Sequence, residues 1–231
     1  MSASAAVAKE FDAKAPAYES NRLAPWYKAH SDHVLEQLSL GPGEVVLDIG
    51  CGTGYLLRRI ASTHRDVTGI GIDVSREMIR IARAKSAAAG LAGLTFVQAD
   101  WGQPSERARA LRATPPASRV ICASTLHYFD EPKAALAAML DALRPGGEVL
   151  VLERAKETSV LTVLWDHLHR RLIKDHVRFY DSAAHVALLE QAGFVRVGIR
   201  SRLNRLFWKR KLYTSLVLVS GTKNGAPRFT R

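Results

Sequence analysis

The stretch Val45–Tyr55, VVLDIGCGTGY, decides the fold. It opens with a short apolar run rich in β-branched residues, which is typical of a buried parallel strand. Gly50, Gly52 and Gly54 follow at alternating positions. Glycine permits a sharp turn and a close ligand there, because it tolerates positive φ and carries no Cβ. From Thr53 the apolar spacing becomes helical, and a strand, a glycine-rich turn and a helix predict the first half of a nucleotide-binding α/β domain.

Carboxylates around the turn narrow the choice of ligand. The dinucleotide pattern needs a glycine where Tyr55 stands, and no Gly-Lys-Ser/Thr follows to make a P-loop. Asp48, at the end of the strand, would repel a phosphate and favour positive charge. A second strand, Val67–Ile72, leads into Asp73, where an acidic side chain can accept hydrogen bonds from ribose hydroxyls. An adenosine joined to a cationic group, as in S-adenosylmethionine, fits this pattern.

Three segments together carry a family resemblance: VLDIGCGTG (Val46–Gly54), GIDVS (Gly71–Ser75) and LRPGGEVLVLE (Leu143–Glu153). They resemble class I S-adenosylmethionine-dependent methyltransferases, most of all the small-molecule branch with quinone-pathway and polyketide-tailoring enzymes. The resemblance spans Phe11 to Gly221. It implies an α/β, Rossmann-like, doubly wound sheet of seven mostly parallel strands in the order 3-2-1-4-5-7-6, with the last strand antiparallel. N-terminal helices and a helical cap inserted after strand 5 complete the expected architecture.

The same resemblance and the positions of turns predict how the chain is divided. Pro16 and Pro25 should break the N-terminal helices. The last strands are expected at Phe194–Ser201 and Tyr213–Ser220, joined by a long basic-aromatic connection, LNRLFWKRKL. The expected segments are an N-terminal helical lid (1–40), a cofactor-binding core (41–154), a helical cap (155–178), the C-terminal part of the α/β domain (179–222) and a tail (223–231).

The resemblance also implies which residues hold the cofactor. In the family, the segment around Tyr18 folds over the cofactor, and the residue at Met78 lies against the adenine. An acidic residue at Asp100 accepts from the adenine amino group, with Trp101 beside the ring. Packing roles stay open for Tyr18 and Met78, and a surface position for Trp101. The set expected to bind S-adenosylmethionine, and its product S-adenosylhomocysteine, is Tyr18, Asp48, Gly50, Cys51, Gly52, Gly54, Asp73, Val74, Met78, Asp100, Trp101, Ala123 and Ser124.

Methyl transfer from a sulfonium is an in-line displacement, so positioning the two reactants is the enzyme's main task. An oxygen nucleophile with a high pKa also needs a general base, worth about 10²–10⁴-fold. The candidates are His127, after strand 4, and His167 and His176 in the cap, with a structural role open for each. A carbon nucleophile, as in an activated ring or enol, can do without a strong base. Substrate contacts are expected from Trp26, Tyr128, Trp165 and Tyr180, and no metal site is predicted.

Composition bounds the remaining possibilities. The chain of 231 residues suits one domain, and no apolar run is long enough to span a membrane. Cys51 and Cys122 suggest no disulfide framework, so we expect a reducing, cytoplasmic setting. The net charge of +11 fits a solvated basic face, an anionic substrate, a membrane surface or RNA. The oligomeric state stays open between monomer and homodimer.

These observations favour methyl transfer to an O, C or N atom of a small, apolar or aromatic metabolite. Two alternatives remain. One is an RNA methyltransferase that uses the basic C-terminal third, although no RNA-binding module and no Asn/Asp-Pro-Pro-aromatic motif is visible. The other is a non-catalytic S-adenosylmethionine-binding protein, because a fold alone does not establish an activity.

Overall fold

The structure is a computed structural model, and it describes residues 3–112, 114–155, 180–207 and 212–225. Its centre is a seven-stranded sheet in the order β3-β2-β1-β4-β5-β7-β6. Only β7 runs against the other strands, pairing antiparallel with β5 and β6. The expected strand order and the reversed last strand are therefore confirmed.

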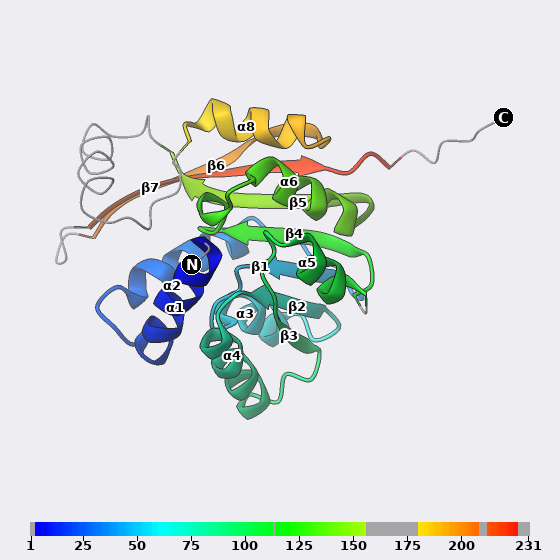
Figure 1. Ribbon diagram of the computed structural model, residues 1–231. Coiled ribbons are helices and arrows are strands. Elements are labelled where there is room, and N and C mark those ends of the chain that lie inside the picture. The colour runs from blue at the N-terminus through cyan, green and yellow to red at the C-terminus, as the bar shows by residue number, and fades with distance from the viewer. Residues whose placement is uncertain (1–2, 113, 156–179, 208–211, 226–231) are drawn as a thin grey trace.

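The elements follow one another as in Figure 1. The strands are β1 (Val45–Ile49), β2 (Thr68–Asp73), β3 (Leu94–Gln98), β4 (Ala117–Ala123), β5 (Leu143–Arg154), β6 (Val195–Phe207) and β7 (Leu212–Thr222). The helices are α1 (Ala3–Lys14), α2 (Ala24–Glu36), α3 (Tyr55–Thr63), α4 (Arg76–Ala88), α5 (Pro104–Leu111), α6 (Pro132–Ala142) and α8 (Ser182–Gln191). Two short 3₁₀ turns are η1 (Ala15–Ala17) and η2 (Leu126–Tyr128). The predicted cap helices, residues 155–178, lie outside the described residues except for Ala155.

Both faces of the sheet are buried, as the continuous apolar strands predict. In β1, Val46 joins the core formed with α2, α3 and α4. Its neighbours Leu47 and Ile49 join the core formed with α5, α6 and α8 on the other face. The strand order reverses between the neighbouring strands β1 and β4, because the helices that follow β1 and β2 cover one face and those that follow β3 and β4 cover the other. Doubly wound sheets open a crevice for ligands at such a point.

The N-terminal helices lie at the carboxyl ends of the central strands (Figure 1). Pro16 sits in η1 and Pro25 in the first turn of α2, so both predicted helix breaks are confirmed. Proline suits the first turn of a helix because the amide hydrogen it lacks would have no partner there. This arrangement brings α1 and α2 over the crevice. Within the described residues, no helix is long and apolar enough to cross a membrane.

The C-terminal hairpin differs from the prediction. Residues 203–207 were expected to belong to a connection, but β6 runs on to Phe207, and its residues pair with β7 in a continuous register from Leu203↔Leu216 to Phe207↔Leu212. The connection is therefore limited to the residues between Phe207 and Leu212. Pairing with β7 outweighs the basic composition that suggested a loop, because cross-strand contacts stabilise a sheet more than local propensity does.

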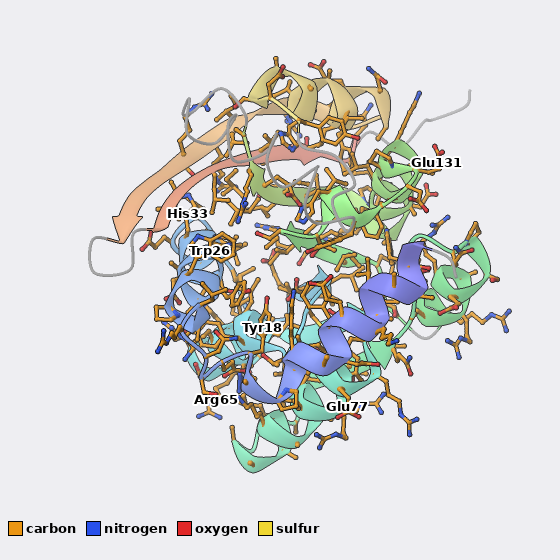
Figure 2. All side chains as sticks on the ribbon, turned by 60° about the vertical axis from the view of Figure 1, so that its left-hand side comes forward. Tyr18, Trp26, His33, Arg65, Glu77 and Glu131 are labelled. Atoms are coloured by element: carbon orange, nitrogen blue, oxygen red, sulfur yellow. The ribbon has the colours of Figure 1, made fainter. Side chains whose placement is uncertain are left out.

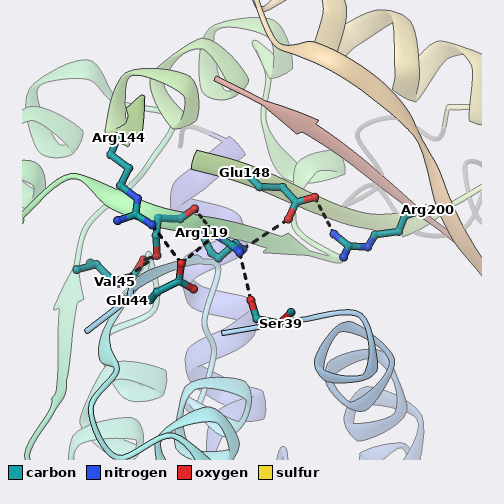
Figure 3. A network of polar contacts seen from close by, with 8 residues as sticks. Ser39, Glu44, Val45, Arg119, Arg144, Glu148 and Arg200 are labelled. Atoms are coloured by element: carbon teal, nitrogen blue, oxygen red, sulfur yellow. Dashed lines mark hydrogen bonds and ion pairs between the residues drawn. The ribbon is translucent and has the colours of Figure 1, made fainter. Parts of the chain in front are cut away.

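A network of charged side chains ties the amino-terminal half of the sheet together (Figure 3). Arg119 in β4 lies 3.4 Å from the Glu44 carboxylate and 3.5 Å from that of Glu148. Arg144 approaches Glu44 at 3.1 Å, and Arg200 approaches Glu148 at 2.7 Å. Each carboxylate is thus shared by two guanidinium groups drawn from different strands.

Candidate functional site

The glycine turn contains three glycines with positive φ, and they serve two different purposes. A Cβ on Gly50 (φ +75°) would lie 2.1 Å from Oγ1 of Thr125, and one on Gly54 (φ +74°) would lie 2.7 Å from the Phe96 ring. These two glycines make room for the protein's own side chains. A Cβ on Gly52 (φ +52°) would meet nothing closer than 4.0 Å, because it would point into a cavity. Gly52 therefore leaves the backbone open to a ligand.

Two buried carboxylates lie beside this turn. Burial, and then the nearby Asp73, raise the pKa of Asp48 to about 7. Burial also raises the pKa of Asp73 to about 6, although its oxygens accept hydrogen bonds from the backbone amides of Gly52 (2.8 Å) and Ser75 (2.9 Å). No described residue gives Asp48 a hydrogen bond or a counter-charge. Two buried acids in this state favour a cation, because its arrival would restore their negative form.

A cavity with about 150 Å³ of free space covers the turn, between the strand ends and the N-terminal helices. All the predicted cofactor residues except Gly54 line it: Tyr18, Asp48, Gly50, Cys51, Gly52, Asp73, Val74, Met78, Asp100, Trp101, Ala123 and Ser124. Gly54 instead packs against Phe96. Residues from β1, β2, β4 and α4, and from the loops next to them, thus meet at one place, as the carboxyl edge of a parallel sheet requires.

Tyr18, directly after η1, forms an aromatic wall of the cavity. Its ring stacks on Tyr27 with 4.4 Å between centroids and 12° between planes, and the Phe11 ring meets it edge-on at 6.4 Å. Burial, and then Tyr27, raise the pKa of Tyr18 above its ordinary value, so the phenol stays neutral. Tyr18 and Trp26 project from the N-terminal segment beside the strand ends (Figure 2).

Two carboxylates hold this N-terminal segment down. Glu19 accepts hydrogen bonds from the Thr53 hydroxyl (2.5 Å) and the Arg58 guanidinium (2.7 Å), and it pairs with Lys85 at 2.8 Å. Burial alone would raise the pKa of Glu19, but the hydrogen bonds from Lys85 and Thr53 hold it below its usual value. Asp12 in α1 accepts two hydrogen bonds at the first turn of α4. The segment is thus fastened to both helices that border the cavity.

The side chains predicted to surround the adenine lie in the first turn of α4 and directly after β3. Trp101 is only 3% exposed, and its indole N–H donates to the Ala135 carbonyl at 3.0 Å. It is therefore a core residue with one part on the cavity wall, which excludes the surface position left open above. Met78 is 1% exposed beneath the turn, and Asp100 accepts from the Gly102 amide at 2.8 Å.

The opposite end of the cavity holds an unpredicted histidine. His30 of α2 is 4% exposed, and its Nδ1 lies 2.8 Å from Oγ of Ser124. Burial, and then the nearby Arg154, lower the pKa of His30 to about 3, so its ring is neutral. A sequence signal did exist, because His30 shares its helix face with Tyr27 and Val34. A histidine on a buried stripe needs a polar partner.

A second histidine lies just beyond. Nδ1 of His127 is 2.8 Å from Oε2 of Glu153, and Oε1 of Glu153 accepts from the Leu126 amide at 2.6 Å. Burial would raise the pKa of Glu153, but His127 lowers it, so the carboxylate stays ionised although it is 2% exposed. His127 is not among the described residues that line the cavity, whereas its neighbour Tyr128 is. Glu153 escaped prediction, although an acid that ends an apolar strand is itself a signal.

The predicted substrate residues are only partly brought together. Trp26 meets the His30 ring edge-on at 4.1 Å, and the Arg154 guanidinium lies 4.9 Å from the Trp26 ring. Tyr180 lies against His185 at 5.5 Å and is not among the described residues that line the cavity. Three predicted residues lie outside the described part of the chain: Trp165, His167 and His176.

Lys28 of α2 is a further residue that the sequence did not predict. It lines the cavity, with its Nζ 5.6 Å from the centroid of the Tyr55 ring. Among the described lining residues it is the only lysine or arginine. Nothing in the sequence marks it, because a lysine at a half-exposed helix position is common.

The fold and the acidic glycine turn together define a nucleoside-binding α/β protein that favours a cationic ligand. A family model described as "Methyltransferase domain" matches residues 46–147. The chain is 31% identical over 173 residues to the ubiquinone biosynthesis O-methyltransferase of Xanthomonas oryzae pv. oryzae, a match that covers 74% of this chain and 67% of that protein. The chain belongs to the class I S-adenosylmethionine-dependent methyltransferases, as its sequence motifs predicted.

Solved structures agree in fold. The [4+2]-cyclase SpnF superposes with a TM-score of 0.73 at 18% identity, covering 96% of this chain and 97% of that one. A phosphoethanolamine-type N-methyltransferase 2 of Haemonchus contortus, determined in complex with S-adenosylhomocysteine, has a TM-score of 0.69 at 14% identity, covering 92% of this chain and 57% of that one. These likenesses carry the fold alone. The RNA methyltransferase and the non-catalytic protein are not favoured by the relatives in sequence.

Proposed function

We propose that this enzyme transfers a methyl group from S-adenosylmethionine to a hydroxyl oxygen of a small, apolar or aromatic metabolite. The observation that carries the proposal is the buried Asp48–Asp73 pair at the open face of the glycine turn. The choice of oxygen is supported by the hydrogen-bonded pair of His127 and Glu153, and by the relative named as an O-methyltransferase.

The lining residues fit the chemistry of the cofactor, which supplies an activated methyl group when bound. Asp48 would hold the ammonium group, Asp73 the ribose hydroxyls and Asp100 the adenine amino group. Lys28 is the cation available for the carboxylate. Because the sulfonium loses its charge during transfer, carboxylates that hold the far ends of the cofactor do not oppose the reaction. The N-terminal segment, fastened by Glu19, would act as the lid.

His127 would take the proton of the acceptor hydroxyl. Glu153 holds the imidazole by Nδ1, which leaves Nε2 as the atom that receives a proton. The buried carboxylate would also stabilise the imidazolium that forms, as the acid of a catalytic triad does. Glu153 is therefore a positioning residue, and its own backbone partner, Leu126, fixes it.

Cofactor binding and turnover test the proposal separately. Calorimetry should show that the protein binds S-adenosylhomocysteine and binds neither ATP nor NAD. Formation of S-adenosylhomocysteine should then be measured with a panel of small aromatic alcohols and matched amines. Turnover confined to hydroxyl acceptors is the expected result. Binding of ATP in place of S-adenosylhomocysteine, or methylation of amines alone, would refute it.

A further inference from the structure

The most unusual polar atom in the cavity is Nε2 of His30. It is buried and has no hydrogen-bond partner, while Nδ1 of the same ring is engaged by Ser124 at 2.8 Å. Among the described residues, three other buried side-chain atoms lack a partner, in Glu10, Glu44 and Ser86, and none of these residues lines the cavity. A buried nitrogen without a partner costs free energy, which a polar ligand atom would recover.

Backbone geometry at Ser124 points to the same place. Ser124 has φ +55°, a conformation that residues with a side chain rarely adopt. Its amide donates to the Leu152 carbonyl at 2.7 Å, and its hydroxyl meets His30. Strain of this kind persists where surrounding contacts enforce it, and it gathers at functional sites. Here it directs the hydroxyl at the end of β4 toward the histidine ring.

We propose that His30 determines acceptor specificity: its Nε2 hydrogen-bonds a second oxygen of the acceptor, next to the oxygen that receives the methyl group. This inference rests on the proposed function above. The His127–Glu153 pair serves the reacting oxygen, so the His30 bond is available to a neighbouring one. His30 itself is no base for the reaction, because burial, and then Arg154, lower its pKa to about 3, which is too low for the ring to hold the proton of an acceptor hydroxyl.

The serine hydroxyl makes this contact adaptable. When it donates to Nδ1, Nε2 carries the hydrogen and can donate to a carbonyl, ether or hydroxyl oxygen. When it accepts from Nδ1–H, Nε2 offers a lone pair to a hydroxyl. In neither state does the ring carry a positive charge that would repel a sulfonium nearby.

The charged and titratable groups around His30 come from three elements. Arg154 and Glu153 face it from β5, His127 from η2, and His33 from α2 itself. Their charges act on the ring in opposite directions, and burial outweighs them all. We therefore expect the acceptor preference that His30 confers to be the same at pH 6 and pH 8.

The test compares two probes of equal shape, 1,2-dihydroxybenzene and 2-methylphenol, on enzyme saturated with S-adenosylhomocysteine. Dissociation constants come from NMR titration. The wild type should favour the dihydroxy probe by about tenfold, the ratio that one net hydrogen bond supplies. His30→Leu should reduce the ratio to about one, and His30→Gln, which restores a donor near Nε2, should recover part of it.

His33→Leu is the matched control, because His33 lies on the same helix, is 7% exposed and bonds Ser201 instead of the cavity wall. It should keep the wild-type ratio. Retained binding of S-adenosylhomocysteine shows that each variant is folded. The inference is overturned if neither probe binds, if the wild type does not discriminate, or if His30→Leu still does. If the wild type fails to bind S-adenosylhomocysteine, the proposed function fails instead.

Discussion

The amino-terminal and the carboxyl ends of the strands differ in how their charged side chains are paired. At the amino-terminal half, Glu44 and Glu148 are each met by two guanidinium groups, with Arg119 between them (Figure 3). At the carboxyl edge, Asp48 and Asp73 are buried side by side, and their pKa values are raised to about 7 and about 6. Charges that hold a fold together are paired within the protein. The two acids to which we assign the cofactor are buried without a counter-charge among the described residues, at a cost in stability.

The carboxyl edge also contains the pair to which we assign the proton transfer. His127 and Glu153 are 2.8 Å apart, with side-chain exposures of 14% and 2%. This pair joins η2 to the end of β5, whereas the Arg119 network joins β4, β5, β6 and the residue before β1. The difference between the two ends of the sheet can therefore be tested by substituting single residues.

The largest effect is expected at His127. Replacing it by alanine removes the proposed base and should lower kcat by about 10²–10⁴-fold, while S-adenosylhomocysteine affinity changes little. Glu153→Gln should lower kcat by less and shift the pH profile, because the imidazolium loses its stabilising charge. The exposed His64 supplies the control variant, His64→Ala. Full turnover by folded His127→Ala, measured by S-adenosylhomocysteine release, would exclude the base.

Asp48→Asn should move binding and stability in opposite directions. Loss of the carboxylate should weaken S-adenosylhomocysteine binding by about 100-fold, the order of a charged hydrogen bond. The ligand-free variant should be more stable than wild type at pH 8, by up to about 4 kcal/mol, because the pKa of Asp48 is raised from 3.8 to about 7 and one pKa unit corresponds to about 1.4 kcal/mol. Calorimetry and urea unfolding measure the two quantities. Asp66→Asn, at an exposed position, should change neither.

The pH dependence follows from the sign of the same shifts. Asp48 and Asp73 hold protons more tightly in the folded state than in the unfolded one. The free energy of unfolding of the ligand-free protein should therefore decrease as the pH rises from about 4 to about 7. A cationic cofactor needs the ionised acids, so its affinity should rise as pH increases from 5.5 to 8. Affinity that is flat over this range, or that falls, would contradict the assignment of these acids to the cofactor.

How much of the structure could be predicted from the sequence depends on how far apart along the chain the interacting residues are. The turn, Asp48, Asp73 and the end of β3 each lie where one strand gives way to the next helix, and each was predictable from the order of the residues around it. His30 and Ser124 are 94 positions apart, and only tertiary packing brings them together. The extension of β6 to Phe207 depends on its pairing with the following strand, β7, which the basic composition of the segment did not indicate.

At the amino-terminal ends of the strands, we expect a substitution to lower stability and leave ligand binding unchanged, which is the reverse of the prediction for Asp48. Arg119→Leu leaves Glu44 and Glu148 with one cation each, and both are largely buried, with side-chain exposures of 13% and 21%. We expect the free energy of unfolding to fall by about 2 kcal/mol, between the values for exposed and buried pairs. S-adenosylhomocysteine affinity should stay within about twofold of wild type. Arg65→Leu, at an exposed position, is the control. A large loss of affinity would mean that the two edges are coupled.

The smallest effect is expected in the N-terminal segment that we propose as a lid, where an ion-paired carboxylate could control how fast the ligand exchanges. The free space of about 150 Å³ is below the roughly 300 Å³ at which small-molecule pockets begin, so we expect the N-terminal segment to move when a cofactor enters. Glu19→Gln keeps the hydrogen bond from Thr53 but loses the charge that Arg58 and Lys85 share. Partly exposed pairs are worth about 1 kcal/mol.

We therefore expect S-adenosylhomocysteine to dissociate about fivefold faster from Glu19→Gln, as measured by stopped-flow fluorescence of the tryptophans. The wild-type rate should rise with salt toward that of the variant, because salt screens the same pairs. Glu77→Gln is a matched control, since its carboxylate pairs only with the neighbouring Arg80 among the described residues. Equal dissociation rates in all three proteins would show that Glu19 fastens the segment without limiting exchange, and the pairing of charge at this edge would then serve stability alone.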